Sequence, residues 1–315
     1  MRFLNFRKSL FCLLLLALLL NIACKHKTKV IKSPPHYNFS EAQTIKLDLK
    51  LKEISGLAWY SEREEFLAQY DEAGKLFVLD KATYEITPHS PYVFGEKGDY
   101  EDIAIYKGVP YILRSDGMIT KIIRDSAGIR GVEAGKIGIT GTNDFETMYA
   151  DTARKALILI CKNCKMDSKT AVSAFAFYPD SIGFVNDPVF TIDAAEVAKL
   201  SPHKTSKLQP SAAGIHPVLK KLFIISSAAS LLVIADLNGK VESVFQLGEK
   251  MFPQPEGLTF KNNGDMYISN EGVTGRATIH RFVYKPESFN FFACGLCPLS
   301  IGSLLTRQCQ YNILR

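Results

Sequence analysis

Short runs of hydrophobic residues recur along the chain from residue 44 onward. Each run spans five to eight residues, and Gly, Asn, Asp and Pro lie between the runs. This pattern is typical of β-strands joined by turns, and no hydrophobic repeat of 3.6 residues extends over most of the body. The sequence therefore predicts an all-β fold.

The predicted strands fall into five similar units. The first strand of each unit begins at a Ser or Glu, and these positions are Ser55, Glu101, Glu146, Ser211 and Glu256. Successive positions are 46, 45, 65 and 45 residues apart. A period near 45 residues with about four strands in each unit is the signature of propeller blades. We therefore predict a β-propeller of four-stranded blades.

The number of blades depends on the long third interval. We expect five blades and keep six as the alternative, in which that interval contains a further blade. With five blades, the interval holds an insertion, with one or two helical turns at 193–199 and a loop at 201–207. The last unit lacks a clear fourth strand. We expect residues 44–51 to supply it, which closes the ring and removes its open sheet edges.

The amino terminus predicts attachment to a membrane. Basic residues precede an unbroken apolar run at 10–20, which is too short to span a bilayer and suits a signal peptide. Ala23 and Cys24 follow and resemble the lipobox of bacterial lipoproteins, where the cysteine carries the lipid. Lipidation at Cys24 is therefore expected. The alternatives are an uncleaved anchor or an ordinary signal peptide, with Cys24 incidental.

The chain is divided accordingly into four parts. They are a lipoprotein signal peptide at 1–23, a polar tether at 24–42, the propeller at 43–285 and a carboxyl-terminal tail of unknown role at 286–315. Residues 25–29 contain no acidic cluster, which favours the periplasmic side of the outer membrane in a bacterial cell envelope.

Charge excludes one class of partner. Seven of the 38 basic residues lie in the first 32 positions, which leaves 31 basic and 32 acidic residues in the remainder. A nucleic-acid partner requires a clustered basic face. The nearly neutral body shows no such cluster, so we expect no nucleic acid among the partners.

The repeated Ser/Glu openings, the last repeat PQPEGLTF at 253–260 and the unit ISSAASLLVIADLNG at 225–239 together resemble a known family. It is the SdiA-regulated family of bacterial propellers, in its lipoprotein branch, and the likeness covers about residues 43–285. The resemblance implies a propeller fold and an envelope location. It also implies a metal, calcium in particular, in the central channel.

The repeat itself places candidate metal ligands together. The first strand of every propeller blade lines the central channel, so Glu101, Glu146 and Glu256 are expected to converge. Converging carboxylates repel one another unless a cation or a proton lies between them, and calcium accepts several oxygen ligands with loose geometry. In the alternative, these glutamates bind backbone N–H groups of the next blade and only hold the ring together.

Further polar residues are expected at the same mouth of the channel, because the second strand of each blade returns there. The expected contacts are Ser55, Asp71, Ser115, Ser211 and Asn270. Asp99 lies two residues before Glu101, and Asp144 lies two residues before Glu146, so both are expected in the same region.

Two C-x-x-C pairs, Cys161–Cys164 and Cys294–Cys297, are candidates for a shared zinc site. An oxidising envelope favours a local disulfide or free thiols instead.

The sequence leaves three hypotheses for the function. The first is a binding module that holds a cation or small ligand, the second is a metal-dependent hydrolase of phosphoesters or lactones, and the third is a platform for a protein partner.

Overall fold

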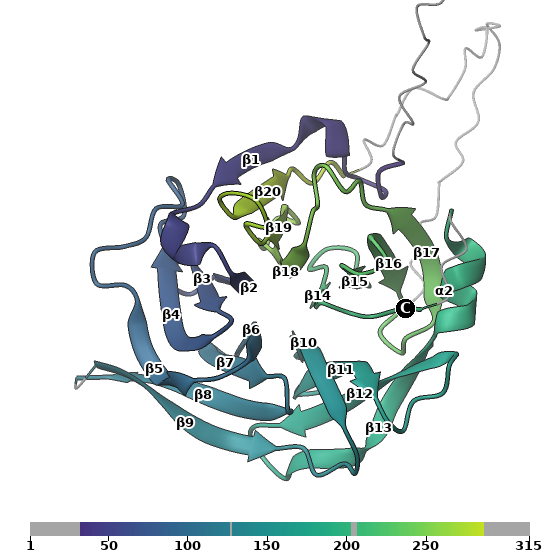
Figure 1. The fold of residues 1–315 in the computed structure, drawn as a ribbon, viewed down its shortest axis with the longest axis horizontal. Helices are drawn as coiled ribbons and strands as arrows, with labels where there is room; N and C mark the ends of the chain where they lie inside the picture. Colours follow the sequence, from purple (N-terminus) through teal and green to yellow (C-terminus); the bar gives the residue numbers. More distant parts are fainter. Residues whose placement is uncertain (1–31, 127, 203–206, 287–315) are drawn as a thin grey trace, which may run out of the picture. The chain divides into compact units, whose positions relative to one another are not determined.

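Five sheets of four antiparallel strands form a ring around a central channel in the computed structural model (Figure 1). The structure describes residues 32–126, 128–202 and 207–286. The sheet order confirms the prediction of a five-bladed propeller, and the alternative of six blades is wrong. The predicted signal peptide, Cys24 and the Cys294–Cys297 pair lie outside the described residues.

Each blade runs from an inner strand to an outer strand. Blade 1 contains β2 (Ile54–Tyr60), β3 (Glu65–Tyr70), β4 (Ala73–Leu79) and β5 (Tyr92–Lys97). Blade 2 contains β6 (Tyr100–Tyr106), β7 (Val109–Arg114), β8 (Met118–Asp125) and β9 (Gly128–Lys136). Blade 3 contains β10 (Asn143–Asp151), β11 (Ala156–Cys164), β12 (Ala171–Tyr178) and β13 (Gly183–Asp193). Blade 4 contains β14 (Ala212–Ile215), β15 (Leu222–Ser226), β16 (Leu231–Ala235) and β17 (Val241–Gln246). Blade 5 contains β18 (Pro255–Phe260), β19 (Met266–Asn270), β20 (Thr278–Phe282) and β1 (Gln43–Lys46).

The core is divided into five hydrophobic clusters, one between each pair of neighbouring blades. In β15, Leu222 and Ile224 enter the cluster shared with blade 3, while Phe223 and Ile225 enter the cluster shared with blade 5. All four side chains are fully buried. Successive strand residues point to opposite faces of a sheet, so a strand that is covered on both faces, such as β15, must be apolar on both.

The amino-terminal strand closes the ring as predicted. β1 pairs with β20 in antiparallel register, Gln43 opposite Arg281 and Lys46 opposite Thr278. The strand is shorter than the predicted 44–51, because residues Leu49–Leu51 form the 3₁₀ helix η2. The Asp48 side chain accepts a hydrogen bond from the Lys50 backbone N–H at the start of that turn.

The predicted tether needs a correction at its carboxyl-terminal end, where Phe39–Glu41 form the 3₁₀ helix η1. Tyr37 and Phe39 are buried in the cluster between blades 4 and 5. The Tyr37 hydroxyl donates to the Gly264 carbonyl oxygen at 2.6 Å and lies 2.7 Å from Nε2 of His216. Two aromatic side chains in an otherwise polar segment explain why it packs against the propeller.

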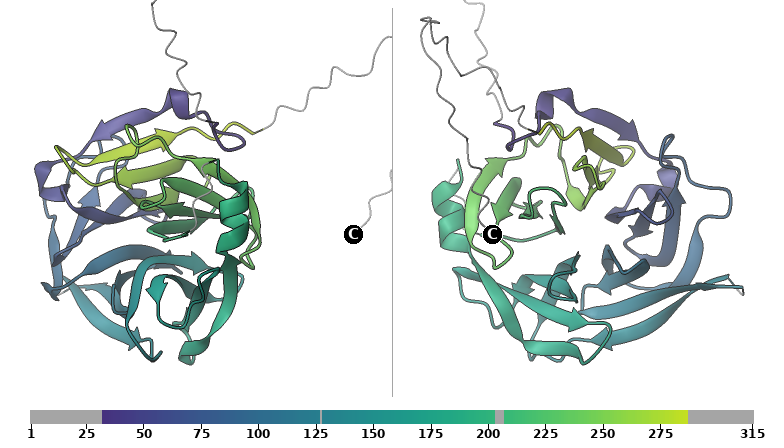
Figure 2. Two further views of the ribbon diagram at one scale, coloured as in Figure 1. Left: turned by 45° about the vertical axis from the view of Figure 1, so that its right-hand side comes forward. Right: turned by 180° about the vertical axis from the view of Figure 1, so that it is seen from behind.

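The long third interval contains an insertion, as predicted. Asp193 accepts hydrogen bonds from the backbone N–H groups of Ala195 and Glu196 and so caps the short helix α2 (Ala194–Leu200). Val197 of α2 is buried in the cluster between blades 3 and 4. The helix therefore lies on the outside of the ring, beside β17 (Figures 1 and 2). None of the helices in the described ranges is long and apolar enough to cross a membrane.

Gly74→Ala is expected to lower the free energy of unfolding by about 2 kcal/mol. A Cβ at Gly74 would lie 2.4 Å from the backbone carbonyl carbon and oxygen of Gly95, so β4 and β5 would have to separate. Gly275→Ala is the matched control, because a Cβ there meets nothing within 4 Å. Urea unfolding of both variants checks the prediction, and equal midpoints would contradict it.

Candidate functional site

One mouth of the channel is lined by residues near the start of the inner strands. In four blades the strand pairing slips by one residue at the repeat position that opens the unit, at Ser55, Glu101, Glu146 and Glu256. A β-bulge leaves its extra residue unpaired and redirects the side chain. The bulges therefore explain how one repeat position supplies side chains to the mouth.

Ser55 and Ser211, the two serines at the repeat position, connect neighbouring blades through hydrogen bonds. The Ser55 hydroxyl donates to the carbonyl oxygen of Tyr100 at 2.6 Å, and Ser211 donates to that of Pro255 at 2.8 Å. Each accepting residue directly precedes a ring glutamate of the next blade. Both serines are buried, and each connects its own blade to the next one.

The glutamates at the repeat position, Glu101, Glu146 and Glu256, all interact electrostatically with one lysine. Lys162, at the end of β11, forms an ion pair with Glu146. The same ammonium group favours ionisation of Glu101 and of Glu256 and so opposes the rise in their pKa values. Glu146 and Glu256 also line a common cavity with Lys162. Lys162 also means that a protein cation already neutralises one of them.

The densest group of carboxylates lies between blades 1 and 2. Asp71 follows β3, Asp99 precedes β6 and Glu101 lies in the β6 bulge. One carboxylate oxygen from each lies within 4.8 Å of those of the other two. None of the three forms an ion pair among the described residues, and Oδ1 of Asp71 is buried without a hydrogen-bond partner there. We call these three residues the acidic cluster.

Burial and repulsion from neighbouring carboxylates disfavour ionisation of Asp71 and Glu101. Burial, followed by the charges of Asp99 and Asp71, raises the pKa of Glu101 to about 9. Burial and the adjacent Asp99 carboxyl raise the pKa of Asp71 to about 6. Because a bound cation favours the ionised form, proton and cation compete for these oxygen atoms.

A second pair of carboxyls lies at the blade 5 side of the mouth. Burial and the nearby Glu271 raise the pKa of Glu256 to about 8, while a hydrogen bond to Ser227 and the charge of Lys162 oppose the rise. Burial, followed by the charge of Asp71, raises the pKa of Glu271 to about 7. Carboxyls from blades 1, 2 and 5 thus affect one another across the mouth.

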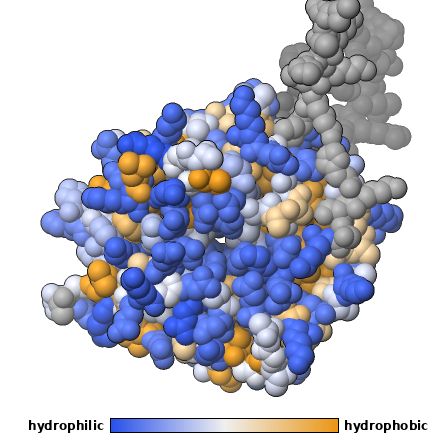
Figure 3. Space-filling model, in the orientation of Figure 1, coloured by the Kyte–Doolittle hydropathy of each residue, from blue (hydrophilic) through white to orange (hydrophobic). Residues whose placement is uncertain are grey.

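The mouth opens into a cavity of about 300 Å³. Its lining includes Glu146, Lys162, Ser211, Ser227 and Glu256. In the face of the propeller shown in Figure 3, hydrophilic residues surround the centre of the ring, and hydrophobic side chains form only small scattered groups. A polar cavity of this size suits a small hydrated or charged ligand.

The remaining predicted contacts have different surroundings. The backbone of Ser115 connects blades 2 and 3, since its N–H donates to the Asp99 carbonyl and its carbonyl accepts from Phe145 N–H, both at 2.9 Å. Asn270 is fully buried, and its amide donates to Thr278 at 3.3 Å. Its Oδ1 has no hydrogen-bond partner among the residues that the structure describes.

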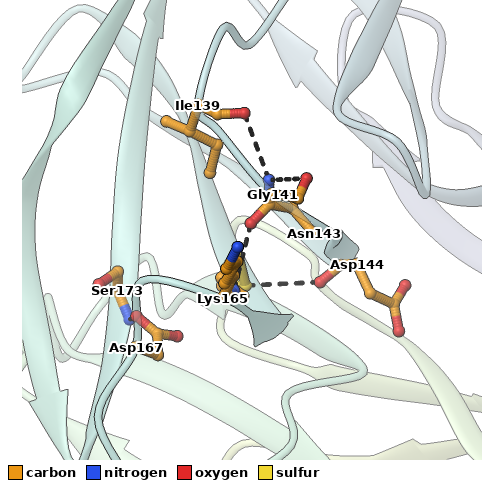
Figure 4. Close-up of a disulfide and its surroundings, with 9 residues drawn as sticks. Ile139, Gly141, Asn143, Asp144, Lys165, Asp167 and Ser173 are labelled. Atoms are coloured by element: carbon orange, nitrogen blue, oxygen red, sulfur yellow. Dashed lines mark hydrogen bonds between the residues drawn. A yellow bond between two sulfur atoms is a disulfide. The ribbon is translucent and has the colours of Figure 1, made fainter.

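Cys161 and Cys164 form a disulfide, which decides between the alternatives that the sequence left open for this pair. Figure 4 shows Asn143 and Asp144 on one side of it and Asp167 and Ser173 on the other. The Cys161 sulfur lies 3.5 Å from the Asp144 carbonyl oxygen. The disulfide spans Lys162 and so anchors the segment that carries the mouth lysine.

Replacing both cysteines with alanine is expected to lower the free energy of unfolding by about 2 kcal/mol, the loop-closure value for so short a ring. Dithiothreitol should reduce the urea midpoint of the unmodified protein to that of the Cys161→Ala/Cys164→Ala variant. The midpoint of the variant should not respond to the reductant. An unmodified protein whose midpoint is unaffected by reductant would count against the bond.

Sequence reasoning missed the part played by Lys162. No repeat predicts a basic residue at the end of this second strand, because the other blades place different residue types at this point. The antiparallel pairing of β10 with β11 places Lys162 beside Glu146, where the register of the two strands shifts. Pairing these two strands by sequence would have indicated the contact.

Comparison with known proteins supports the fold. No family model matches the sequence, and a search of curated proteins finds no match. The structure is similar to a glutaminyl cyclase from Myxococcus xanthus, with a TM-score of 0.51 and 12% identity over 78% of this chain and 96% of that chain. A gluconolactonase from Xanthomonas campestris gives a TM-score of 0.49 and 10% identity over 80% and 96%. A soluble aldose sugar dehydrogenase from Escherichia coli gives 0.49 and 9% over 78% and 100%. At 12% identity, the likeness to the glutaminyl cyclase shows the β-propeller fold alone, and this fold is shared by enzymes and binding proteins.

Proposed function

We propose that this protein is a lipid-anchored binding module of the bacterial cell envelope, of the SdiA-regulated type, and that its channel mouth holds a divalent cation. The observation that carries the proposal is the acidic cluster. Its carboxylates come from two blades, they lack ion pairs among the described residues, and they lie close enough to share one ion.

The spacing of the acidic cluster suits calcium. Calcium binds oxygen at about 2.3–2.6 Å, so two ligands on opposite sides of one ion are about 5 Å apart. The cluster oxygens all lie within 4.8 Å of one another, which is inside that limit. The set shares only Glu101 with the ligands expected from sequence. Glu146 is paired with Lys162, and Glu256 lies on the blade 5 side of the mouth.

A small ligand would occupy the adjoining 300 Å³ cavity, where Lys162, Ser227 and Glu256 supply polar contacts. Lipidation at Cys24 would attach the protein from its amino-terminal side. In the described part of the chain, Tyr37 bonds to Gly264 in the turn between β18 and β19, at the end of blade 5 opposite the mouth. We therefore propose that the mouth faces away from the periplasmic surface of the outer membrane.

Elemental analysis tests the cation proposal. Chelator-treated protein is dialysed against calcium or magnesium, and bound metal is counted for each chain. We expect about one calcium ion for each chain in the unmodified protein. The ion should be lost in Asp71→Asn/Asp99→Asn, because only the Glu101 carboxylate of the acidic cluster would remain. Asp187→Asn, at an exposed aspartate of β13, is the control. Equal calcium content in the double variant and the control would refute the proposed site.

A further inference from the structure

A cavity beside α2 lies next to the channel mouth but is distinct from the acidic cluster. Its volume is about 640 Å³, in the range of small-molecule sites. One wall is the segment from Lys162 to Val172, which joins β11 to β12. The opposite wall comes from α2 and from the pair Lys207 and Leu208.

The floor of this cavity is apolar and made of small side chains. Ala194, Ala195 and Ala198 of α2 face it together with Val172 and Leu208. Val172, Ala194 and Leu208 also belong to the core cluster between blades 3 and 4, so the floor is supported by buried packing. Three alanines leave open a volume that longer side chains would fill. This surface suits an apolar ligand body.

The rim of the cavity is basic. It carries Lys162, Lys169 and Lys207, with Asp167 as its carboxylate. Asp167 accepts a hydrogen bond from the Ser173 backbone N–H at 3.1 Å, and Lys162 pairs with Glu146. Lys169 and Lys207 are exposed and form no ion pair within the described ranges. The cavity lining therefore combines two lysines that lack an ion pair in those ranges with several apolar side chains.

We infer that this cavity is a second binding site, which takes a small organic carboxylate with an apolar body. The apolar part packs on the alanines of α2, and the carboxylate lies between Lys169 and Lys207. An ammonium group binds a carboxylate as a point charge without fixed geometry, so the site selects negative charge and apolar size more than a particular shape. The site uses no member of the acidic cluster, so it is independent of the cation proposal.

Calorimetric titration with octanoate tests the inference, with 1-octanol and octylammonium as probes of equal chain length. Octanoate should bind saturably at millimolar concentration and more tightly than either control probe. Lys169→Gln/Lys207→Gln should weaken octanoate binding by about tenfold and leave octanol unchanged. The matched control is Lys46→Gln/Lys75→Gln, which removes the same charge from exposed lysines outside the cavity.

A cavity-filling variant separates this site from binding elsewhere on the protein. Ala198→Leu should weaken both octanoate and octanol, because it occupies the floor that both alkyl chains use. Its urea midpoint establishes that it folds. The inference is overturned if octanoate shows no saturable binding, if octanol binds as tightly, or if the two lysine double variants behave alike. It is also overturned if folded Ala198→Leu binds octanoate normally.

Discussion

Glu101→Gln is expected to stabilise the protein in the absence of calcium and to destabilise it when calcium is added. In chelator at about pH 9, the variant should melt about 3–6 °C above the unmodified protein, which corresponds to about 1–2 kcal/mol. With excess calcium at the same pH, the variant should melt below it, because it lacks a ligand to the ion. Thermal unfolding followed by circular dichroism checks both halves of the prediction.

The sign follows from proton binding. The pKa of Glu101 is raised from 4.5 to about 9, so the folded chain holds a proton that the unfolded chain has lost. That contribution to stability is complete below the unfolded pKa and is lost as the pH rises through about 9. The metal-free protein should therefore lose stability between about pH 6.5 and 9, and Glu101→Gln should flatten this fall.

The choice of pH range and a control variant make the pH measurement specific to Glu101. The window starts near pH 6.5 because burial lowers the pKa of His216 to about 4, and a buried neutral histidine costs stability at lower pH. Glu133→Gln removes a carboxylate from an exposed position of β9 and should keep the slope of the unmodified protein. A Glu101→Gln slope equal to that of Glu133→Gln would show that Glu101 titrates normally.

Asp102→Ala is expected to lower the free energy of unfolding by about 3 kcal/mol. Asp102 is only 4% exposed and lies in β6. Its two oxygens accept backbone hydrogen bonds at 2.8 Å, one from Ile103 and one from Met148 in the next blade. Alanine would leave both N–H groups buried without this acceptor, and each such loss costs about 1–3 kcal/mol.

The graded variant Asp102→Asn refines this test. Asparagine keeps one acceptor oxygen and should lose about half as much stability as alanine. Asp187→Ala, at an exposed position of β13, should remain within about 0.5 kcal/mol of the unmodified protein. Urea unfolding at neutral pH provides the three values. If Asp102→Ala and Asp187→Ala unfold at the same urea concentration, Asp102 does not connect the blades energetically.

The propeller was predictable because its pattern repeats. Strand-forming runs at intervals near 45 residues predict a blade even when each run is unremarkable, and residues such as Leu222 and Phe223 on adjacent positions report a strand buried on both faces. The amino-terminal closure was predictable because the last unit lacked a strand. Tyr37 and Phe39 lie outside the repeat, so their packing had no periodic signal.

The candidate site was predictable only in outline. The repeat position placed Glu101, Glu146 and Glu256 at one mouth, but side-chain directions there depend on β-bulges, and bulges do not follow from spacing. The acidic cluster combines a bulge residue with Asp99 and Asp71, which lie just outside strands. The Asp102 connection between blades depends on close approach of backbones, which no pattern of side chains reports.

Isothermal titration of chelator-treated protein with calcium at about pH 8 tests the central claim most directly. We expect one saturable site, weaker binding at about pH 6.5 because protons compete for Asp71 and Glu101, and at least a tenfold loss of affinity in Asp71→Asn. Absence of saturable heat at pH 8, or equal affinity in Asp71→Asn, would contradict the claim that the acidic cluster binds a cation.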